Sequence, residues 1–97
     1  MSSRTDYMLR MRRIDDMDLK PREVLMLWAV DTKPGMMGRE LAVELGYRSR
    51  SNVQDGIRRL IEKGLMEDRR IVKDKHTPND LHATPAGIKF LAEIAPQ

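Results

Sequence analysis

The first element predicted by the pattern of apolar residues is an amphipathic helix over residues 5–17. Tyr7, Met11 and Ile14 recur at i, i+4 and i+7, which places them on one helical face. Met8 lies alongside, and arginines occupy much of the remaining surface. A lone helix of this length is marginal in water, so its apolar stripe needs either the rest of the chain or a second subunit to cover it.

A second helix is predicted to begin near Pro21, because proline suits the first turn of a helix. Residues 24–30 are all apolar and include Trp28. A helix that is apolar all round is usually buried, so we expect this one to run through the middle of the core with Trp28 packed inside. The turn residues of segment 32–35 (TKPG) end it.

Two further helical patterns follow. Residues 38–45 predict a short helix, which Gly46 ends in the left-handed conformation. The next helix begins at Ser49 or Ser51, both of which suit an N-cap, and runs to Lys63. Its apolar stripe consists of Val53, Ile57, Leu60 and Ile61.

The rest of the chain predicts a hairpin and a last helix. Residues 65–72 form a strand and residues 81–83 its return strand, with the polar loop 73–80 between them. Thr84 and Pro85 cap and start the last helix. The order helix, helix, short helix, helix, hairpin, helix predicts a mainly α fold with a small β-hairpin.

Two helices joined by a glycine-containing turn and followed by a hairpin are the layout of a winged helix-turn-helix, in which the hairpin is the wing. A chain of 97 residues allows one modest core. We therefore assign residues 19–97 to a winged helix-turn-helix domain with a three-helix core and a wing. Residues 1–18 are an N-terminal helical arm and a candidate dimerisation element.

Four short motifs carry a family resemblance: residues 19–25 (LKPREVL), 40–46 (ELAVELG), 60–67 (LIEKGLME) and 83–87 (ATPAG). Together they resemble the MarR-type winged-helix repressors. Residues 46–66 are also similar to the DNA-binding domain of the LexA repressor. The resemblance implies a transcriptional regulator of repressor type that binds double-stranded DNA sequence-specifically and acts by occupying its site.

The chain departs from the MarR pattern at three places. Lys20 stands where that pattern has a capping serine or threonine, and Gly56 replaces a bulkier residue in the recognition helix. The sequence ends at Gln97, before the long C-terminal helices of the family, so we expect no MarR-style response to a small molecule.

A helix-turn-helix inserts the start of its second helix into the major groove. Resemblance to the LexA domain places base contacts at Ser49, Ser51, Asn52, Gln54 and Asp55. Asn52 or Gln54 suits adenine and Asp55 suits a cytosine amino group, although Asp55 has an alternative partner in Arg59 at i+4. The predicted DNA-binding residues of the turn and helix are Arg48, Ser49, Arg50, Ser51, Asn52, Gln54, Asp55, Arg58 and Arg59.

The distribution of charge also indicates a polyanionic partner. The net charge is only +3, but residues 48–75 contain nine basic and five acidic residues, a local excess of four. By resemblance, the cations of the wing touch phosphates or reach into the minor groove. The predicted wing residues are Arg69, Arg70, Lys73, Lys75 and His76. A plain solvated surface is the alternative.

The sequence argues against several other classes of protein. It has no cysteine, its longest apolar run is far below the roughly 20 residues of a membrane span, and its start lacks a secretory signal, so we expect a cytoplasmic protein. His76 and His82 are the only histidines. Together with Asp74 and Asp80 they could meet around a metal, but they lack metal-ligand spacing. We predict no enzyme, no cofactor and no metal site.

The predicted partners are double-stranded DNA and a second copy of the chain, with no membrane. The candidate dimerisation residues are Tyr7, Met11, Ile14, Phe90 and Ile94, the last two of which look exposed on the final helix. The same domain would also suit a replication, partition or phage DNA-binding protein, or a protein-interaction module. The arginines of the turn, helix and wing favour duplex DNA.

Overall fold

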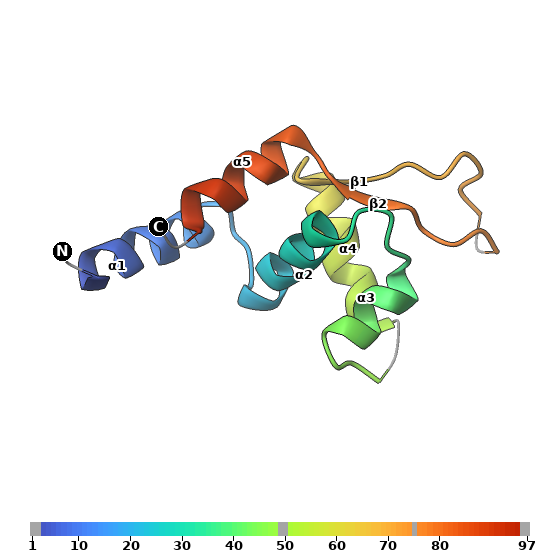
Figure 1. The fold of residues 1–97 in the computed structure, drawn as a ribbon, viewed down its shortest axis with the longest axis horizontal. Coiled ribbons are helices and arrows are strands. Elements are labelled where there is room, and N and C mark those ends of the chain that lie inside the picture. The colour runs from blue at the N-terminus through green and yellow to red at the C-terminus, as the bar shows by residue number, and fades with distance from the viewer. Residues whose placement is uncertain (1–2, 49–50, 75, 96–97) are drawn as a thin grey trace.

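The computed structural model of the chain describes residues 3–48, 51–74 and 76–95. In these residues, five helices and a two-stranded antiparallel sheet follow one another in the order shown in Figure 1. The elements are α1 (Ser3–Asp16), α2 (Pro21–Thr32), α3 (Gly38–Glu44), α4 (Ser51–Glu62), β1 (Met66–Asp68), β2 (Leu81–Ala83) and α5 (Pro85–Ile94). This order confirms the predicted fold class.

The core lies between α2, α4 and the hairpin. Met26, Leu27 and Val30 of α2 are fully buried, as are Val53 and Leu60 of α4. Burying each such side chain contributes about 1.5–3 kcal/mol relative to leaving it exposed. The contact between α2 and α4 therefore holds α4 in place. This is the helix that the sequence predicts to read DNA.

Gly56 of α4 faces Met26 of α2. A Cβ atom at position 56 would lie 2.5 Å from the Met26 sulfur, well inside van der Waals contact. The glycine leaves the space that the fully buried methionine fills. The absence of a bulkier residue at Gly56 thus has a packing reason.

One face of α2 is exposed, contrary to expectation. Leu25 is 54% exposed and Trp28 is 40% exposed. The elements packed on α2 are α3, α4, α5 and β2, and they leave this face uncovered. The prediction that Trp28 packs inside the core is therefore wrong, because an unbroken apolar run does not reveal which side of a helix its neighbours cover.

The hairpin is shorter than predicted. β1 and β2 pair in the register Met66↔Ala83, Glu67↔His82 and Asp68↔Leu81. The Asp68 carboxylate accepts the backbone N–H groups of Arg70 and Asp80 at 3.2 and 3.1 Å. Because a side chain takes donors that a longer ladder would use, the first strand ends at Asp68 and not near residue 72. We call residues 66–83 the wing.

The caps of α2 and α5 differ in kind. Thr84 caps α5 as predicted: its Oγ1 accepts the Gly87 N–H at 3.0 Å and donates to the Gly64 carbonyl at 2.6 Å. Lys20 caps α2 with no side-chain hydrogen bond. Instead, its backbone N–H donates to Glu23 Oε1 at 2.8 Å. Glu23 thus supplies the glutamate half of a capping box, which satisfies the N–H of the cap residue.

Glycines shape two junctions of the fold. Gly46 ends α3 with a φ of 77°, which confirms the predicted left-handed turn. Gly87 passes so close to the backbone of Leu65 that a Cβ atom there would overlap the Leu65 carbonyl oxygen. That oxygen accepts the Thr84 N–H at 3.1 Å, so α5 and the wing are fixed to the same backbone atom.

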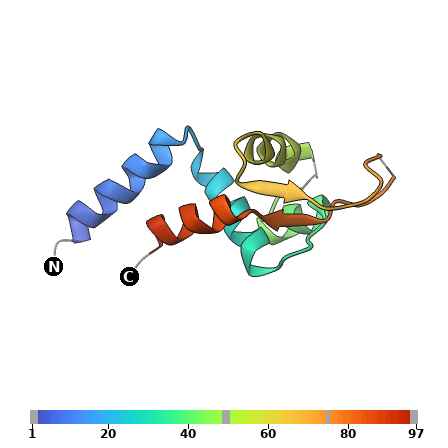
Figure 2. The same ribbon diagram turned by 90° about the horizontal axis from the view of Figure 1, so that it is seen from above.

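Phe90 and Ile94 belong to the core, where they are 1% and 6% exposed. The prediction that they form an exposed dimerisation surface is therefore wrong. α5 is covered on one side by α1, whose Arg13 pairs with Glu93 and lies 5.7 Å from the centre of the Phe90 ring. Arm and final helix hence form one unit, at the opposite end of the molecule from the wing (Figures 1 and 2).

Candidate nucleic-acid interface

The start of α4 presents the polar face that the sequence predicts. Ser51, Gln54 and Asp55 are exposed, whereas Val53 and Ile57 are buried. Asn52 is the second residue of α4. The remaining predicted residues of the turn, Ser49 and Arg50, lie outside the described residues.

Asp55 pairs with a different arginine from the one considered in the sequence. Its Oδ1 lies 3.0 Å from Nη2 of Arg58, and Nε of Arg58 lies 3.8 Å from Oε1 of Glu62. Both pairs are exposed, and such pairs are worth about 1 kcal/mol or less. Asp55 and Arg58 can therefore exchange these contacts for contacts to another molecule at little cost.

Arg59 takes no part in this exposed face. Its guanidinium donates to the Asp18 carbonyl and lies 3.5 Å from Oε2 of Glu23, which is buried. Asp18 itself has a φ of 55°, an uncommon conformation for a residue other than glycine. Arg59 thus ties α4 to the loop between α1 and α2, and we leave it out of the interface.

Arg70 of the wing is also engaged internally. Its Nε lies 2.9 Å from Oδ2 of Asp68, and its Nη1 donates to the carbonyl oxygens of Asp74 and Thr77 at 3.0 and 2.6 Å. Arg69 pairs with Glu67 beside it. Arg70 therefore closes the loop of the wing, and its charge is directed inward.

Two carboxylates of the wing have lowered pKa values. Burial acts to raise the pKa of Asp68, but hydrogen bonds from Asn79, Asp80 and Arg70, together with the Arg70 charge, outweigh it. The pKa of Asp74 is lowered chiefly by hydrogen bonds from Thr77, with a further one from the His76 backbone. Both groups are thus held as carboxylates that order the loop.

Since Arg58, Arg59, Arg69 and Arg70 are paired within the chain, the unpaired positive charge near α4 and the wing belongs to other residues. Within residues 3–48, 51–74 and 76–95, Arg39, Arg48 and Lys73 have no acidic partner. Arg39 and Arg48 line one hollow of about 430 Å³, together with His76 from the wing. We call it the basic hollow; its lining is Met37, Gly38, Arg39, Arg48, His76, Thr77, Pro78 and Asn79.

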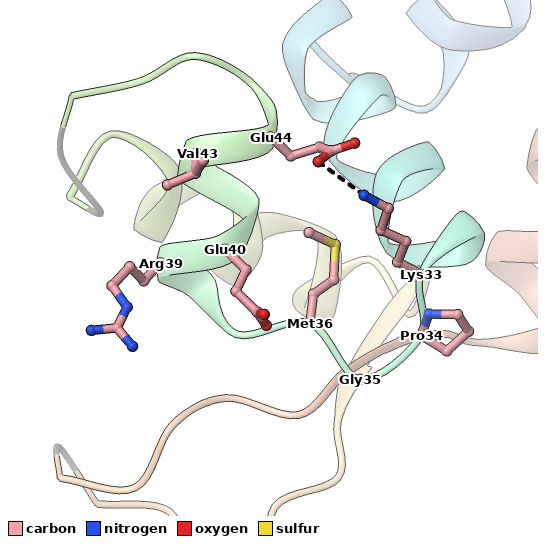
Figure 3. Close-up of a pocket in the computed structure, with 8 residues that line it drawn as sticks. All are labelled: Lys33, Pro34, Gly35, Met36, Arg39, Glu40, Val43 and Glu44. Carbon is pink, nitrogen blue, oxygen red and sulfur yellow. Dashed lines mark hydrogen bonds and ion pairs between the residues drawn. The ribbon is translucent and has the colours of Figure 1, made fainter.

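Arg39 was not predicted from the sequence. It lies in the first turn of α3 and extends away from the ion pair between Lys33 and Glu44, whose atoms are 3.2 Å apart (Figure 3). That pair borders a second hollow, of about 490 Å³, between the end of α2 and α3. The signal that could have revealed Arg39 is a basic residue at the exposed start of the first helix of a helix-turn-helix.

The histidines and aspartates of the wing are engaged in separate sets of contacts. The described residues contain no cluster of three His, Asp or Glu side chains able to hold a metal ion. In the wing, His82 Nε2 lies 2.8 Å from Asp80 Oδ1, whereas Asp74 binds backbone N–H groups, so the two aspartates are engaged separately. None of the described helices is long and apolar enough to span a membrane. Lys75 lies outside the described residues.

Comparison with solved structures identifies the architecture. A MarR crystal structure superposes with a TM-score of 0.74 over 94% of this chain, at 22% identity. The fold is a MarR-like winged helix. The CouR repressor bound to a 23-mer DNA duplex gives a TM-score of 0.72 at 24% identity over 93% of the chain. The S. aureus MepR–DNA complex gives 0.68 at 19% identity over 84%.

This winged helix spans only part of those proteins. It covers 65% of the MarR chain, 62% of CouR and 60% of MepR. By sequence, the chain matches no protein-family model and no curated protein. The likeness therefore concerns the fold, and the function must be argued from the residues of this chain.

Proposed function

We propose that this chain binds double-stranded DNA sequence-specifically and regulates transcription by occupying its site. The observation that carries the proposal is the basic hollow, in which unpaired arginines from α3 and the following turn meet the wing. A polyanion is the partner that such a set of charges favours. CouR and MepR, which share the fold, have been solved with DNA.

The two parts of the interface have different roles. The start of α4 enters the major groove, where Gln54 suits adenine and Asp55 suits the amino group of cytosine. Arg39 and Arg48 bind phosphates beside that groove and set the register of the helix without reading sequence. Specificity and affinity are thus divided between α4 and the basic hollow.

Selection of bound sequences from a random duplex pool tests the proposal, followed by titrations at several salt concentrations. Arg48→Ala and Arg39→Ala should each weaken binding to all duplexes and lower the slope of log affinity against log salt by roughly 0.9. Gln54→Ala should relax base choice at one position, at a cost of about 1–3 kcal/mol. Arg22→Ala is the matched control, since it removes an exposed arginine from the start of α2.

Enrichment of a motif and loss of affinity in the two arginine variants, with Arg22→Ala unchanged, supports the proposal. If no duplex is enriched, or if all three arginine variants lose affinity equally, the basic hollow is not a DNA site. A protein-interaction module would enrich no duplex.

We further propose that the chain pairs with a second copy through α1. Its exposed apolar residues are Tyr7, Met8, Leu9 and Met11, which are 62%, 64%, 58% and 40% exposed. Ile14, by contrast, packs against the core of its own chain. A symmetric dimer predicts half-sites about 10 bp apart, or a multiple of that spacing. Light scattering at tens of micromolar should give a dimer mass for the wild type and a monomer mass for Met8→Lys. A monomeric wild type would refute the proposed dimer.

A further inference from the structure

The wing exposes two large apolar side chains beside its cations. Ile71 is 98% exposed and Val72 is 55% exposed. Among the described large apolar residues, Val43 on α3 is second in exposure to Ile71, at 74%. Burial of an isoleucine contributes about 1.5–3 kcal/mol, so a partner that covers Ile71 would gain affinity from it.

The loop around these residues is held in place on both sides. Before them, Arg70 is fixed by Asp68 and donates to the carbonyl oxygens of Asp74 and Thr77. After them, the Asp74 carboxylate accepts the backbone N–H groups of His76 and Thr77 at 2.9 and 2.8 Å. The projection of Ile71 is thus imposed by its neighbours, and a contact made by it costs little ordering entropy.

The charges nearby indicate what the side chain meets. Lys73 has no acidic partner in the described residues, and the return side of the wing contributes His76 to the basic hollow. The acidic groups of the wing are engaged with Arg69, Arg70, His82 and backbone N–H groups. A partner that satisfies both features is a polyanion with an apolar edge, which describes the sugars and base edges of a DNA minor groove.

From this we infer that Ile71, supported by Val72, is an apolar wedge that enters the minor groove of the bound duplex beside the phosphates held by Lys73. Aliphatic side chains are known to act in this way in proteins that widen or kink the minor groove. The inference rests on the proposed function, and it adds a contact that reads groove shape instead of charge.

The salt dependence of binding separates the wedge from the cations. Ile71→Ala should weaken binding to the selected duplex by about tenfold at every salt concentration, with the slope unchanged, because no counterion is released by an apolar contact. Lys73→Ala should lower the slope by roughly 0.9. Val43→Ala is the matched control and should bind as the wild type does. Melting temperatures should agree across the set, because both apolar side chains are exposed.

A second measurement places the wedge in the minor groove. Duplexes with G·C or inosine·C pairs in the flank beside the wing differ by the guanine amino group in that groove, while their major-groove edges match. The wild type should prefer inosine·C, and Ile71→Ala should lose that preference. An equal response of the two proteins would overturn the wedge.

Other results also decide the matter. If Ile71→Ala binds as the wild type does while Lys73→Ala binds weakly, the wing contacts DNA without the wedge, and only this inference fails. If Ile71→Ala changes the mass in light scattering but not DNA affinity, the side chain covers a second copy. If the wild type binds no duplex, the proposed function fails as well.

Discussion

The wing and α1 lie at opposite ends of the molecule, and different contacts hold them (Figure 2). The wing is ordered by polar groups: Asp68 and Asp74 accept backbone N–H groups, and Arg70 closes the loop between them. α1 is seated by apolar packing of Ile14 and by Arg13 against α5. At each end, side chains that take no part in these contacts remain exposed: Ile71 and Lys73 on the wing, and Tyr7, Met8 and Leu9 on α1.

The division between side chains that hold each end and side chains that remain exposed connects stability with recognition. In the wing, carboxylates neutralise the cations that order the loop, and the arginines of the basic hollow keep their charge for a partner. In α1, Ile14 and the Arg13 contacts hold the helix, and Tyr7, Met8 and Leu9 keep an apolar surface. The comparison implies that damage to structure and damage to binding come from different residues at each end.

The largest effect is expected at Gly87, where the two ends are joined. Gly87→Ala places a Cβ atom against the Leu65 carbonyl oxygen, which belongs to backbone and cannot rotate away. We expect a loss of about 3 kcal/mol in the free energy of unfolding, measured by denaturant titration. The control is Gly56→Ala, which meets the flexible side chain of Met26 and gains helix propensity. Equal stability of both variants would show that α5 can shift freely on the wing.

Arg70→Ala should have the next largest effect, confined to the wing. It removes the loop's donor to Asp74 and Thr77 and leaves the nearly buried Asp68 without its cation. We expect a loss of about 2 kcal/mol in the free energy of unfolding. Amide exchange should become faster in the wing and stay unchanged in α1. Arg69→Ala removes a neighbouring exposed charge and should cost far less. If the two variants match, the polar network does not hold the wing.

Much of the fold could be predicted because its signals are local. Gly46 marks a left-handed turn, Thr84 marks a cap, and the 3.6-residue stripe of α4 identifies Val53 and Ile57 as buried. The errors concern tertiary cover. Trp28 and Phe90 both sit on largely apolar helices, and the neighbouring elements decide that the first is exposed and the second is buried.

The candidate interface was harder to predict, because the sequence shows charges but not their partners. Arg58, Arg59, Arg69 and Arg70 all count toward the basic excess, yet each is paired within the chain. Pairs such as Arg59 with Glu23 join residues 36 positions apart, a distance at which no periodicity applies. Arg39 was missed for the converse reason, since it approaches the wing only in the folded chain.

Acid should destabilise the wing more than it destabilises α1. The pKa of Asp68 is lowered in the folded state, so its stabilising contribution is complete above the ordinary aspartate pKa of about 3.9 and is lost as the pH falls through the folded-state value. Asp68→Asn should therefore flatten the decline in melting temperature below pH 4. Glu93→Gln should flatten it less, although hydrogen bonding to Arg13 lowers the pKa of Glu93 in the same direction, because that pair is exposed. A larger flattening in Glu93→Gln than in Asp68→Asn would place the acid-sensitive contact in the arm.

The smallest effect is expected from Arg13→Ala. This change removes the ion pair with Glu93 and the contact with the Phe90 ring, both at the exposed seam between α1 and α5. The melting temperature should fall less than in Arg70→Ala, but amide exchange should quicken in α1 while the wing keeps its protection. Arg12→Ala removes an exposed charge from the same helix and should leave exchange in α1 unchanged. Because the apolar face of α1 is untouched, the Arg13→Ala variant should still dimerise, with a lower association constant. An unchanged association constant would mean that α1 associates without being seated on α5.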